Sequence, residues 1–218
     1  MCRVSDQEYY LSYYDEDYSH NDTATVIYRS TNGGETWEFS NALQNIKTLS
    51  LEYSEIDQKV KAAYFVVDED SNSVITFSKD ALVDDIASSS ISVAISNHSS
   101  PNTKLEITDN DKIWLVYNDL TIYNQEYSHS DVLYLSSEDN GETWLHTKNF
   151  TKFVGDDILV SIGKDSIYPI ACIISNRAEK QKQIASTSAH RITLSMLLLR
   201  FFINFINLKL ARKAVQLF

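Results

Sequence analysis

Short apolar runs of strand-like composition recur in a fixed order along the first 175 residues of the chain. Each run is four to eight residues long, rich in Tyr, Val, Ile and Leu, and bounded by polar turn residues, which is typical of β-strands. Two such runs precede each of two similar octapeptides, so the order predicts a repeated unit of antiparallel strands. The runs are Tyr9 to Asp15 and Thr25 to Tyr28 in one unit, and Lys112 to Asn118 and Asp131 to Tyr134 in the other.

The two octapeptides are STNGGETW, beginning at Ser30, and SEDNGETW, beginning at Ser137. Asn-Gly and Asp-Asn-Gly tolerate the positive φ of tight hairpin loops, so each octapeptide predicts a turn between two antiparallel strands. The Asn or Asp side chain is expected to accept bonds from backbone N–H groups, Ser and Thr to supply hydroxyl partners, and Trp to bury its ring. The predicted turn residues are Ser30, Asn32, Gly34, Thr36, Trp37, Ser137, Asp139, Gly141, Thr143 and Trp144.

Two further units are predicted from the same order. Ser30 and Ser137 lie 107 positions apart, about twice the length of one four-stranded unit, so another unit is expected between them. It has strand-like runs at 61–68 and 74–80, and its Ser78 to Asp80 are interpreted as a decayed turn that lacks the Gly and Trp. A fourth unit begins with runs at 157–161 and 167–174, and first strands are predicted at 49–55 and 104–108.

The pattern Ser-x-Asp-x-Gly-x-Thr-Trp resembles the Asp box, or bacterial neuraminidase repeat (BNR), of the sialidase superfamily. The octapeptide at Ser137 matches throughout, and the one at Ser30 carries Asn32 in place of Asp. The resemblance covers about residues 7 to 175. It implies an all-β fold: an incomplete sialidase-like β-propeller of four-stranded antiparallel blades, with about three blades and the start of a fourth.

Charge divides the chain into two unlike parts. Residues 1–176 hold 11 Lys and Arg against 29 Asp and Glu, a balance of −18, whereas residues 177–218 hold 8 against 1, a balance of +7. All 13 Tyr, all three Trp and every Gly and Pro lie in the first part, so a domain boundary is predicted at 176/177. The acidic first part excludes nucleic acid as a partner, because phosphate binding needs a basic surface.

The second part is predicted to be a basic, apolar helical tail. Its longest uncharged stretch is shorter than a membrane span of about 20 residues, and Arg200 interrupts it. Two interpretations stay open: a helix that lies on an anionic membrane surface, or the product of a shifted reading frame, since the composition changes where a third strand of the fourth unit is due.

Two segments between second and third strands are the predicted ligand-face loops. They span 15–22 and 119–131, and in a four-stranded meander they emerge at the end opposite the Asp boxes. Mixtures of aromatic and carboxylate side chains commonly bind sugars or cations; the alternative is that these loops are solvated copies left by duplication. The candidate ligand residues are Tyr18, His20, Asp22, Tyr127, His129 and Asp131.

No catalytic, metal-binding or cofactor-binding residue is predicted. The resemblance implies that a sialidase needs an arginine cluster for the substrate carboxylate, a Tyr/Glu pair and an acid, but residues 1–176 contain only Arg3 and Arg29 and lack the Arg-Ile-Pro signature. The acidic run beginning at Asp68 resembles an EF-hand loop only at its start, since position six is Ser73 and position twelve is Lys79. Cys2 and Cys172 fit neither a disulfide scaffold nor a zinc site.

The expected function is that of a non-catalytic or catalytically incomplete sialidase-like protein that binds glycans or a protein partner. The alternative is a fragment of an exo-α-sialidase or other glycoside hydrolase whose catalytic residues lie in other blades. Family resemblance implies an extracellular or cell-surface location, although the sequence that begins Met1-Cys2-Arg3 shows no signal peptide.

Overall fold

The structure is a computed structural model that describes residues 1–175 except 20, 21, 84, 125, 126 and 152–154. The chain divides into a compact unit Met1–Ala178 and a second unit Glu179–Phe218. The predicted helical tail, residues 177–218, lies outside the described residues. Within the described part, no helix has the length and apolar character required to cross a membrane.

The described residues form antiparallel sheets in which strands that are consecutive in sequence are also neighbours. The first sheet contains β1 (Cys2–Arg3), β2 (Tyr9–Ser19), β3 (Asp22–Ser30) and β4 (Glu38–Gln44). The second contains β5 (Lys47–Ser54), β6 (Lys59–Val67), β7 (Ser73–Ser78) and β8 (Ser90–Ser96). The third contains β9 (Thr103–Ile107), β10 (Ile113–Asn124), β11 (Tyr127–Ser137) and β12 (Leu145–Asn149), and the fourth pairs β13 (Asp157–Asp165) with β14 (Tyr168–Ser175).

The predicted all-β class is therefore confirmed, with three four-stranded antiparallel sheets and a fourth of two described strands. A short 3₁₀ helix, η1 (Ile86–Ser89), is the one helical element of the described residues. The first strand of the first sheet, β1, was not predicted, because two residues are too short to carry a periodic pattern.

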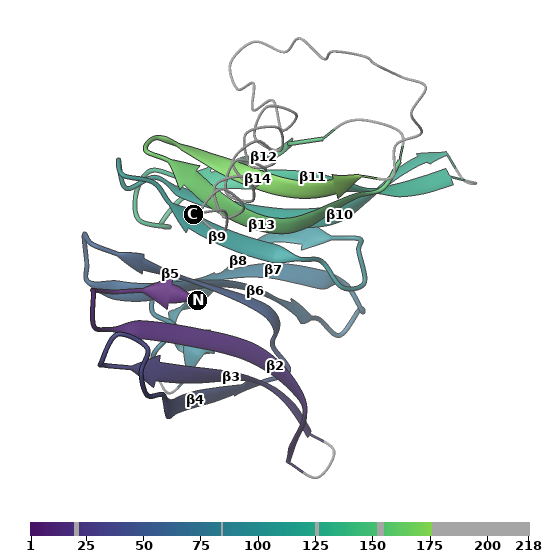
Figure 1. Ribbon diagram of the computed structural model, residues 1–218. Helices are drawn as coiled ribbons and strands as arrows, with labels where there is room; N and C mark the ends of the chain where they lie inside the picture. Colours follow the sequence, from purple (N-terminus) through teal and green to yellow (C-terminus); the bar gives the residue numbers. More distant parts are fainter. Residues whose placement is uncertain (20–21, 84, 125–126, 152–154, 176–218) are drawn as a thin grey trace, which may run out of the picture. The chain divides into compact units, whose positions relative to one another are not determined.

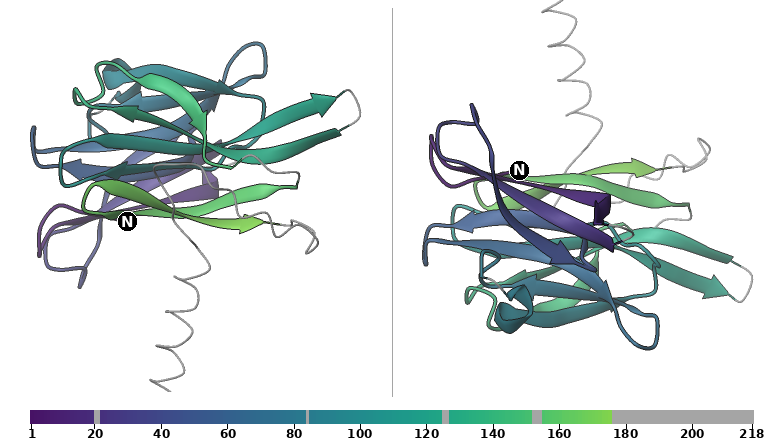
Figure 2. Two further views of the ribbon diagram at one scale, coloured as in Figure 1. Left: turned by 90° about the horizontal axis from the view of Figure 1, so that it is seen from above. Right: turned by 90° about the horizontal axis from the view of Figure 1, so that it is seen from below.

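The two predicted loops at 15–22 and 119–131 are largely strand, which corrects the sequence-based prediction. β10 and β11 stay paired well past β9, with Asp119 opposite Asp131 and Thr121 opposite His129. Polar side chains do not prevent this, because the ladder is made by backbone N–H and C=O groups. The β10–β11 hairpin consequently projects beyond its neighbours (Figure 2).

Successive sheets are stacked face to face (Figure 1). Three apolar clusters of side chains lie between them. Burial of these side chains, at about 25 cal/mol per Å² of apolar surface, is the main force that holds the sheets together. The first cluster joins Ile27 and Leu43 to Val60 and Tyr64; the second joins Phe65 and Phe77 to Leu115 and Tyr117; the third joins Val116 and Val132 to Leu159 and Ala171.

The first strands of successive sheets lie next to one another. β5 contacts β1 and β9, and β13 contacts β9. The backbone N–H of Leu105 on β9 donates to Ser50 Oγ on β5 at 3.0 Å, which fixes the two strands against each other. First strands thus gather on one side of the stack.

Candidate functional site

The turn at Ser137 is held by a compact set of side-chain hydrogen bonds. Ser137 Oγ donates to Asp139 Oδ1 at 2.8 Å and accepts from the Gly141 N–H at 2.9 Å. Asp139 Oδ1 also accepts from the Thr143 N–H at 2.8 Å, and Oδ2 accepts from the Thr143 hydroxyl. These hydrogen bonds, first from Thr143 and then from Ser137, lower the pKa of the Asp139 carboxyl to about 2.

The turn at Ser30 has the same arrangement. The Gly34 N–H donates to Ser30 Oγ at 2.9 Å, and the Thr36 N–H donates to Asn32 Oδ1 at 2.9 Å. The substitution of Asn32 for Asp reverses one bond, since Asn32 Nδ2 now donates to Thr36 Oγ1 at 2.8 Å. Trp37 Nε1 donates to the Gly34 carbonyl oxygen at 3.1 Å.

The turn at Ser137 also joins the third sheet to the second. The Trp144 ring packs edge-on against Phe77 of β7, with ring centroids 5.0 Å apart. Asn140 Nδ2 donates to Asp57 Oδ2 at 2.9 Å, and Lys79 Nζ lies 2.6 Å from a carboxylate oxygen of Glu142. This turn is therefore a contact between sheets as well as a link between strands.

The position predicted as a decayed box has a different turn. Asp80 Oδ1 accepts from the Leu82 N–H at 3.2 Å, and Ser78 Oγ and Ser89 Oγ lie 2.7 Å apart. The connection continues through η1 before β8 begins at Ser90. Asp80 is thereby left at the edge of the sheet, where it lines a groove.

Of the six candidate ligand residues, the structure describes the side chains of Tyr18, His129 and Asp131. Tyr18 is 38% exposed, and His20 lies outside the described residues. Asp22 begins β3 and Tyr127 begins β11. The side chains of His129 and Asp131 are buried, at 1% and 0% exposure.

Asp131 is held inside the third sheet by hydroxyl donors. Thr121 Oγ1 donates to its Oδ2 at 2.7 Å and Thr151 Oγ1 donates to its Oδ1 at 3.1 Å, while His129 Nε2 lies 3.3 Å from Oδ2. Beside it, Asn118 Nδ2 donates to the Asp157 carbonyl oxygen at 2.8 Å, which ties β10 to β13. His129 and Asp131 therefore lie among protein side chains inside the third sheet. Ligand contact by the two hairpins stays a prediction.

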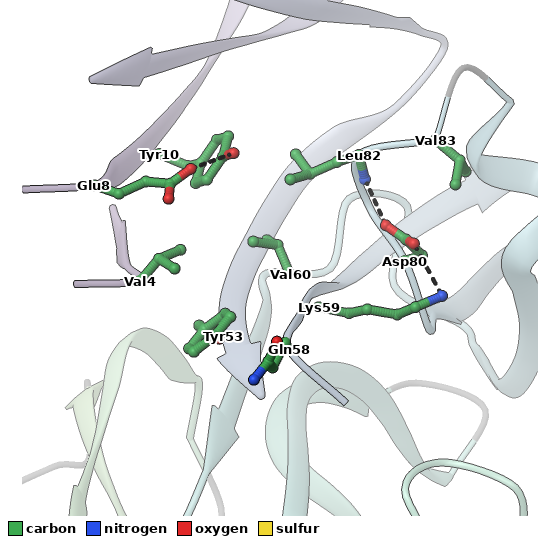
Figure 3. Close-up of a pocket in the computed structure, with 10 residues that line it drawn as sticks. All are labelled: Val4, Glu8, Tyr10, Tyr53, Gln58, Lys59, Val60, Asp80, Leu82 and Val83. Carbon is green, nitrogen blue, oxygen red and sulfur yellow. Dashed lines mark hydrogen bonds and ion pairs between the residues drawn. The ribbon is translucent and has the colours of Figure 1, made fainter. Parts of the chain in front are cut away.

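A groove of about 460 Å³ lies between the first and second sheets. Figure 3 shows Glu8 and Tyr10 on one side and Lys59 and Asp80 on the other, with Val60 and Leu82 between them. The remaining lining residues are Val4, Tyr53, Gln58 and Val83.

The polar groups of the groove are held in place by partners. The Tyr10 hydroxyl donates to Glu8 Oε1 at 3.0 Å, and Arg29 Nε donates to the same oxygen at 2.8 Å. Burial and then the neighbouring Glu8 raise the pKa of Tyr10 to about 12, so it stays a neutral donor. On the other side, Lys59 Nζ lies 3.1 Å from Asp80 Oδ2.

The groove was not predicted from the sequence. Its lining comes from the β1–β2 connection, β2, β5, the β5–β6 connection, β6 and the residues after β7. No local motif joins these segments, and only the packing of two sheets brings them together.

Two acidic residues, Glu52 and Glu106, lie on the neighbouring strands β5 and β9. Glu106 of β9 is 6% exposed, directly opposite Trp114 in the β9–β10 ladder. Burial, with a further contribution from the charge of Glu52 on β5, raises the pKa of Glu106 to about 7, although Lys164 of β13 opposes the shift. Burial also raises the pKa of Glu52.

Glu106 is expected to make the protein less stable as the pH rises from about 4.5 to about 7. The folded state binds this proton more tightly than the unfolded chain, so its contribution is complete below the unfolded pKa and is lost as the pH passes the folded value. The loss should be on the order of 2 to 3 kcal/mol. Urea unfolding of the wild type and Glu106→Gln across this range measures it.

The variant should show a much flatter pH dependence than the wild type, and the exposed Glu55→Gln should not. An unchanged pH profile in Glu106→Gln would show that other groups cause the dependence.

Comparison with protein-family models and with characterised protein sequences gave no match. Among solved structures, the chain is similar to a mannose phosphorylase from Leishmania mexicana, with a TM-score of 0.48 and 10% identity over 68% of this chain and 49% of that one. It thus spans about half the length of that enzyme. It is also similar to a fucose lectin from Kordia zhangzhouensis, with a TM-score of 0.40 and 14% identity over 66% of this chain and 93% of that one.

Proposed function

We propose that the chain is a non-catalytic, sialidase-like Asp-box protein that binds glycans in the groove between its first two sheets. The observation that carries the proposal is the pairing of fixed carboxylates with apolar and aromatic side chains in that groove. Residues 1–176 are its binding domain, an incomplete β-propeller. Residues 177–218 are a separate tail, and the protein acts outside the cell or at its surface.

The groove offers what a sugar ring requires. Glu8 and Asp80 supply acceptors for hydroxyl groups, and Lys59 and Gln58 supply donors. Charged partners make hydrogen bonds roughly twice as strong as neutral ones. Tyr53 with Val60 and Leu82 provides apolar surface for the C–H face of the ring, in keeping with binding sites that combine apolar walls and a few convergent polar groups.

Charge favours neutral glycans over sialylated ones. Two carboxylates line the groove, Lys59 is paired with one of them, and residues 1–176 carry a balance of −18. A sialic acid carboxylate would approach this surface against repulsion, and a like-charge contact weakens binding.

The arginines of the described residues support a non-catalytic role. Arg29 lies 2.7 Å from a carboxylate oxygen of Glu8, and Arg3 forms an ion pair with Asp6. An arginine already paired with a protein carboxylate is poorly placed to clamp a substrate carboxylate, which usually requires a bidentate contact. Glu106, despite its raised pKa, is buried at 6% exposure and does not line the groove.

Lys59→Ala and Asp80→Ala are each expected to weaken glycan binding about tenfold, the effect of losing one charge-assisted hydrogen bond of about 1.4 kcal/mol. The full chain would be applied to an array of immobilised neutral and sialylated oligosaccharides, and the tightest would be titrated by calorimetry. Asp109→Ala is the matched control, because Asp109 forms a similar exposed ion pair, with Lys164, outside the groove.

Equal loss of affinity in Asp109→Ala would place the ligand elsewhere. An array without binding would leave a protein partner as the better candidate for this domain. Release of the aglycone from fluorogenic sialosides or hexosides by the full chain would favour the glycoside hydrolase alternative.

A further inference from the structure

One face of the first sheet is exposed. The equivalent faces of the second and third sheets are buried. We call the side chains of Leu11, Tyr13, Tyr28 and Phe39 the first outer face; Leu11 is 37%, Tyr13 46% and Phe39 55% exposed. The three aromatic rings form a row across three strands, with centroids 6.0 Å apart from Tyr13 to Tyr28 and 6.2 Å apart from Tyr28 to Phe39. Large contiguous apolar surfaces of this kind usually mark an interaction site.

The strand register identifies the counterparts. Ser30, Ser78 and Ser137 each end the third strand of a sheet and pair with Tyr9, Ala62 and Ile113 of the second strand. Two residues further along the second strand, Leu11 corresponds to Tyr64 and to Leu115. Tyr64 is 2% and Leu115 0% exposed, because each is covered by the preceding sheet. A sheet of the same construction is therefore what this face is built to meet.

The fourth sheet exposes the complementary kind of surface. We call Ile158, Cys172 and Ile174 the fourth outer face; Ile158 and Ile174 are directly paired and are 46% and 62% exposed. Their neighbours Leu159 and Ile173 point the other way, into the cluster shared with the third sheet. In the second sheet, the equivalent side, with Phe65 and Phe77, is buried against the next sheet.

We propose that the first outer face of one copy of the chain packs against the fourth outer face of a second copy. Each interface then repeats the sheet-on-sheet contact that the chain already makes between its own sheets. The contact is head-to-tail, and two copies that exchange it twice close into a symmetric pair with both outer faces covered. Closure doubles the buried area, which brings such a pair closer to the size of stable interfaces.

Sedimentation velocity of the full chain should show a dimer that dissociates on dilution. Tyr13→Lys should raise the dimer dissociation constant at least about tenfold, since aromatic anchors dominate interface energies. Ile95→Lys is the matched control, because it also replaces an apolar side chain with lysine, at a 61% exposed position of β8 outside both faces. Ile174→Lys tests the opposite face, so the proposal stays falsifiable if Tyr13→Lys fails to fold.

Cys172 reports the orientation of the two copies. It is exposed, whereas Cys2 is buried with its pKa raised to about 12 by that burial. Under mild oxidation by air and copper phenanthroline, Leu11→Cys should form a disulfide-linked dimer through Cys172 that the wild type and Leu11→Cys/Cys172→Ser do not form.

A monomer at every concentration would overturn the proposal, and so would a dimer that survives both Tyr13→Lys and Ile174→Lys. Equally fast crosslinking of the wild type would also overturn it, because that result requires two fourth outer faces to meet each other. Larger species that the same two variants abolish would support the contact without closure.

Discussion

Gly141→Ala is expected to lower the free energy of unfolding by about 3 to 4 kcal/mol, the sum of a left-handed backbone penalty and overpacking of the core. Gly141 has φ +85°, and a Cβ there would lie 2.9 Å from Cζ of Phe77 and closer still to its Cε1. The Phe77 ring is fully buried and packs against Trp144, so it has little room to move aside. Urea unfolding measures the loss.

Gly34→Ala is the matched control for this prediction. Gly34 is the equivalent residue of the other turn and has φ +92°, but the nearest atom to its added Cβ lies 3.8 Å away, in Trp37. Its cost should be about 1 to 2 kcal/mol, from the backbone alone. In a Phe77→Leu background, Gly141→Ala should approach the cost of Gly34→Ala; equal costs in the wild-type background would mean that the turn does not press against Phe77.

Asp57→Ala is expected to cost about 3 to 5 kcal/mol, because it leaves a buried ammonium group without its counter-charge. The side chain of Lys61 is completely buried, and its Nζ lies 2.7 Å from Asp57 Oδ2, which also accepts the bond from Asn140 of the next sheet. Partial burial alone would raise the pKa of Asp57, but hydrogen bonds from Lys61 and Asn140 outweigh it and lower that pKa. Thermal and urea unfolding report the loss.

Two variants separate the buried charge from other effects. Asp109→Ala removes an exposed ion pair and should cost less than about 1 kcal/mol. Asp57→Ala/Lys61→Met should recover much of the stability lost in Asp57→Ala, because an apolar replacement of a buried pair is tolerated better than half of the pair. A double variant no more stable than Asp57→Ala would assign the cost to the lost bond with Asn140 instead.

The strands were the most predictable feature of the fold. Runs such as Thr25 to Tyr28 and Lys112 to Asn118 carry their own signal, since β-branched and aromatic residues favour extended backbone and the polar turns bound them. The continuation of β10 to Asn124 was predicted as loop, although it contains Thr121, Ile122 and Tyr123, which favour extended backbone. Backbone pairing with β11 makes this segment a strand. The sequence of one strand does not indicate which strand it pairs with.

For the candidate sites too, local contacts could be predicted from the sequence, whereas contacts between sheets could not. The hydrogen bonds between Ser137, Asp139 and Thr143 join residues within six positions, so local spacing was enough to anticipate such a turn. The contact of that turn with Phe77 and Asp57 joins residues more than 60 positions apart. Nothing in the octapeptide itself indicates which sheet it touches.

By itself, the sequence determined that this protein is an all-β chain of repeated four-stranded units joined by hairpins, because strand composition and turn chemistry act over a few residues. The tertiary structure alone decided that His129 and Asp131 are buried, that a groove opens between Glu8 and Asp80, and that one face of the first sheet is uncovered. These features depend on which sheet faces which. Burial of apolar side chains from distant segments determines which sheets pack together, and no local sequence pattern indicates that pairing.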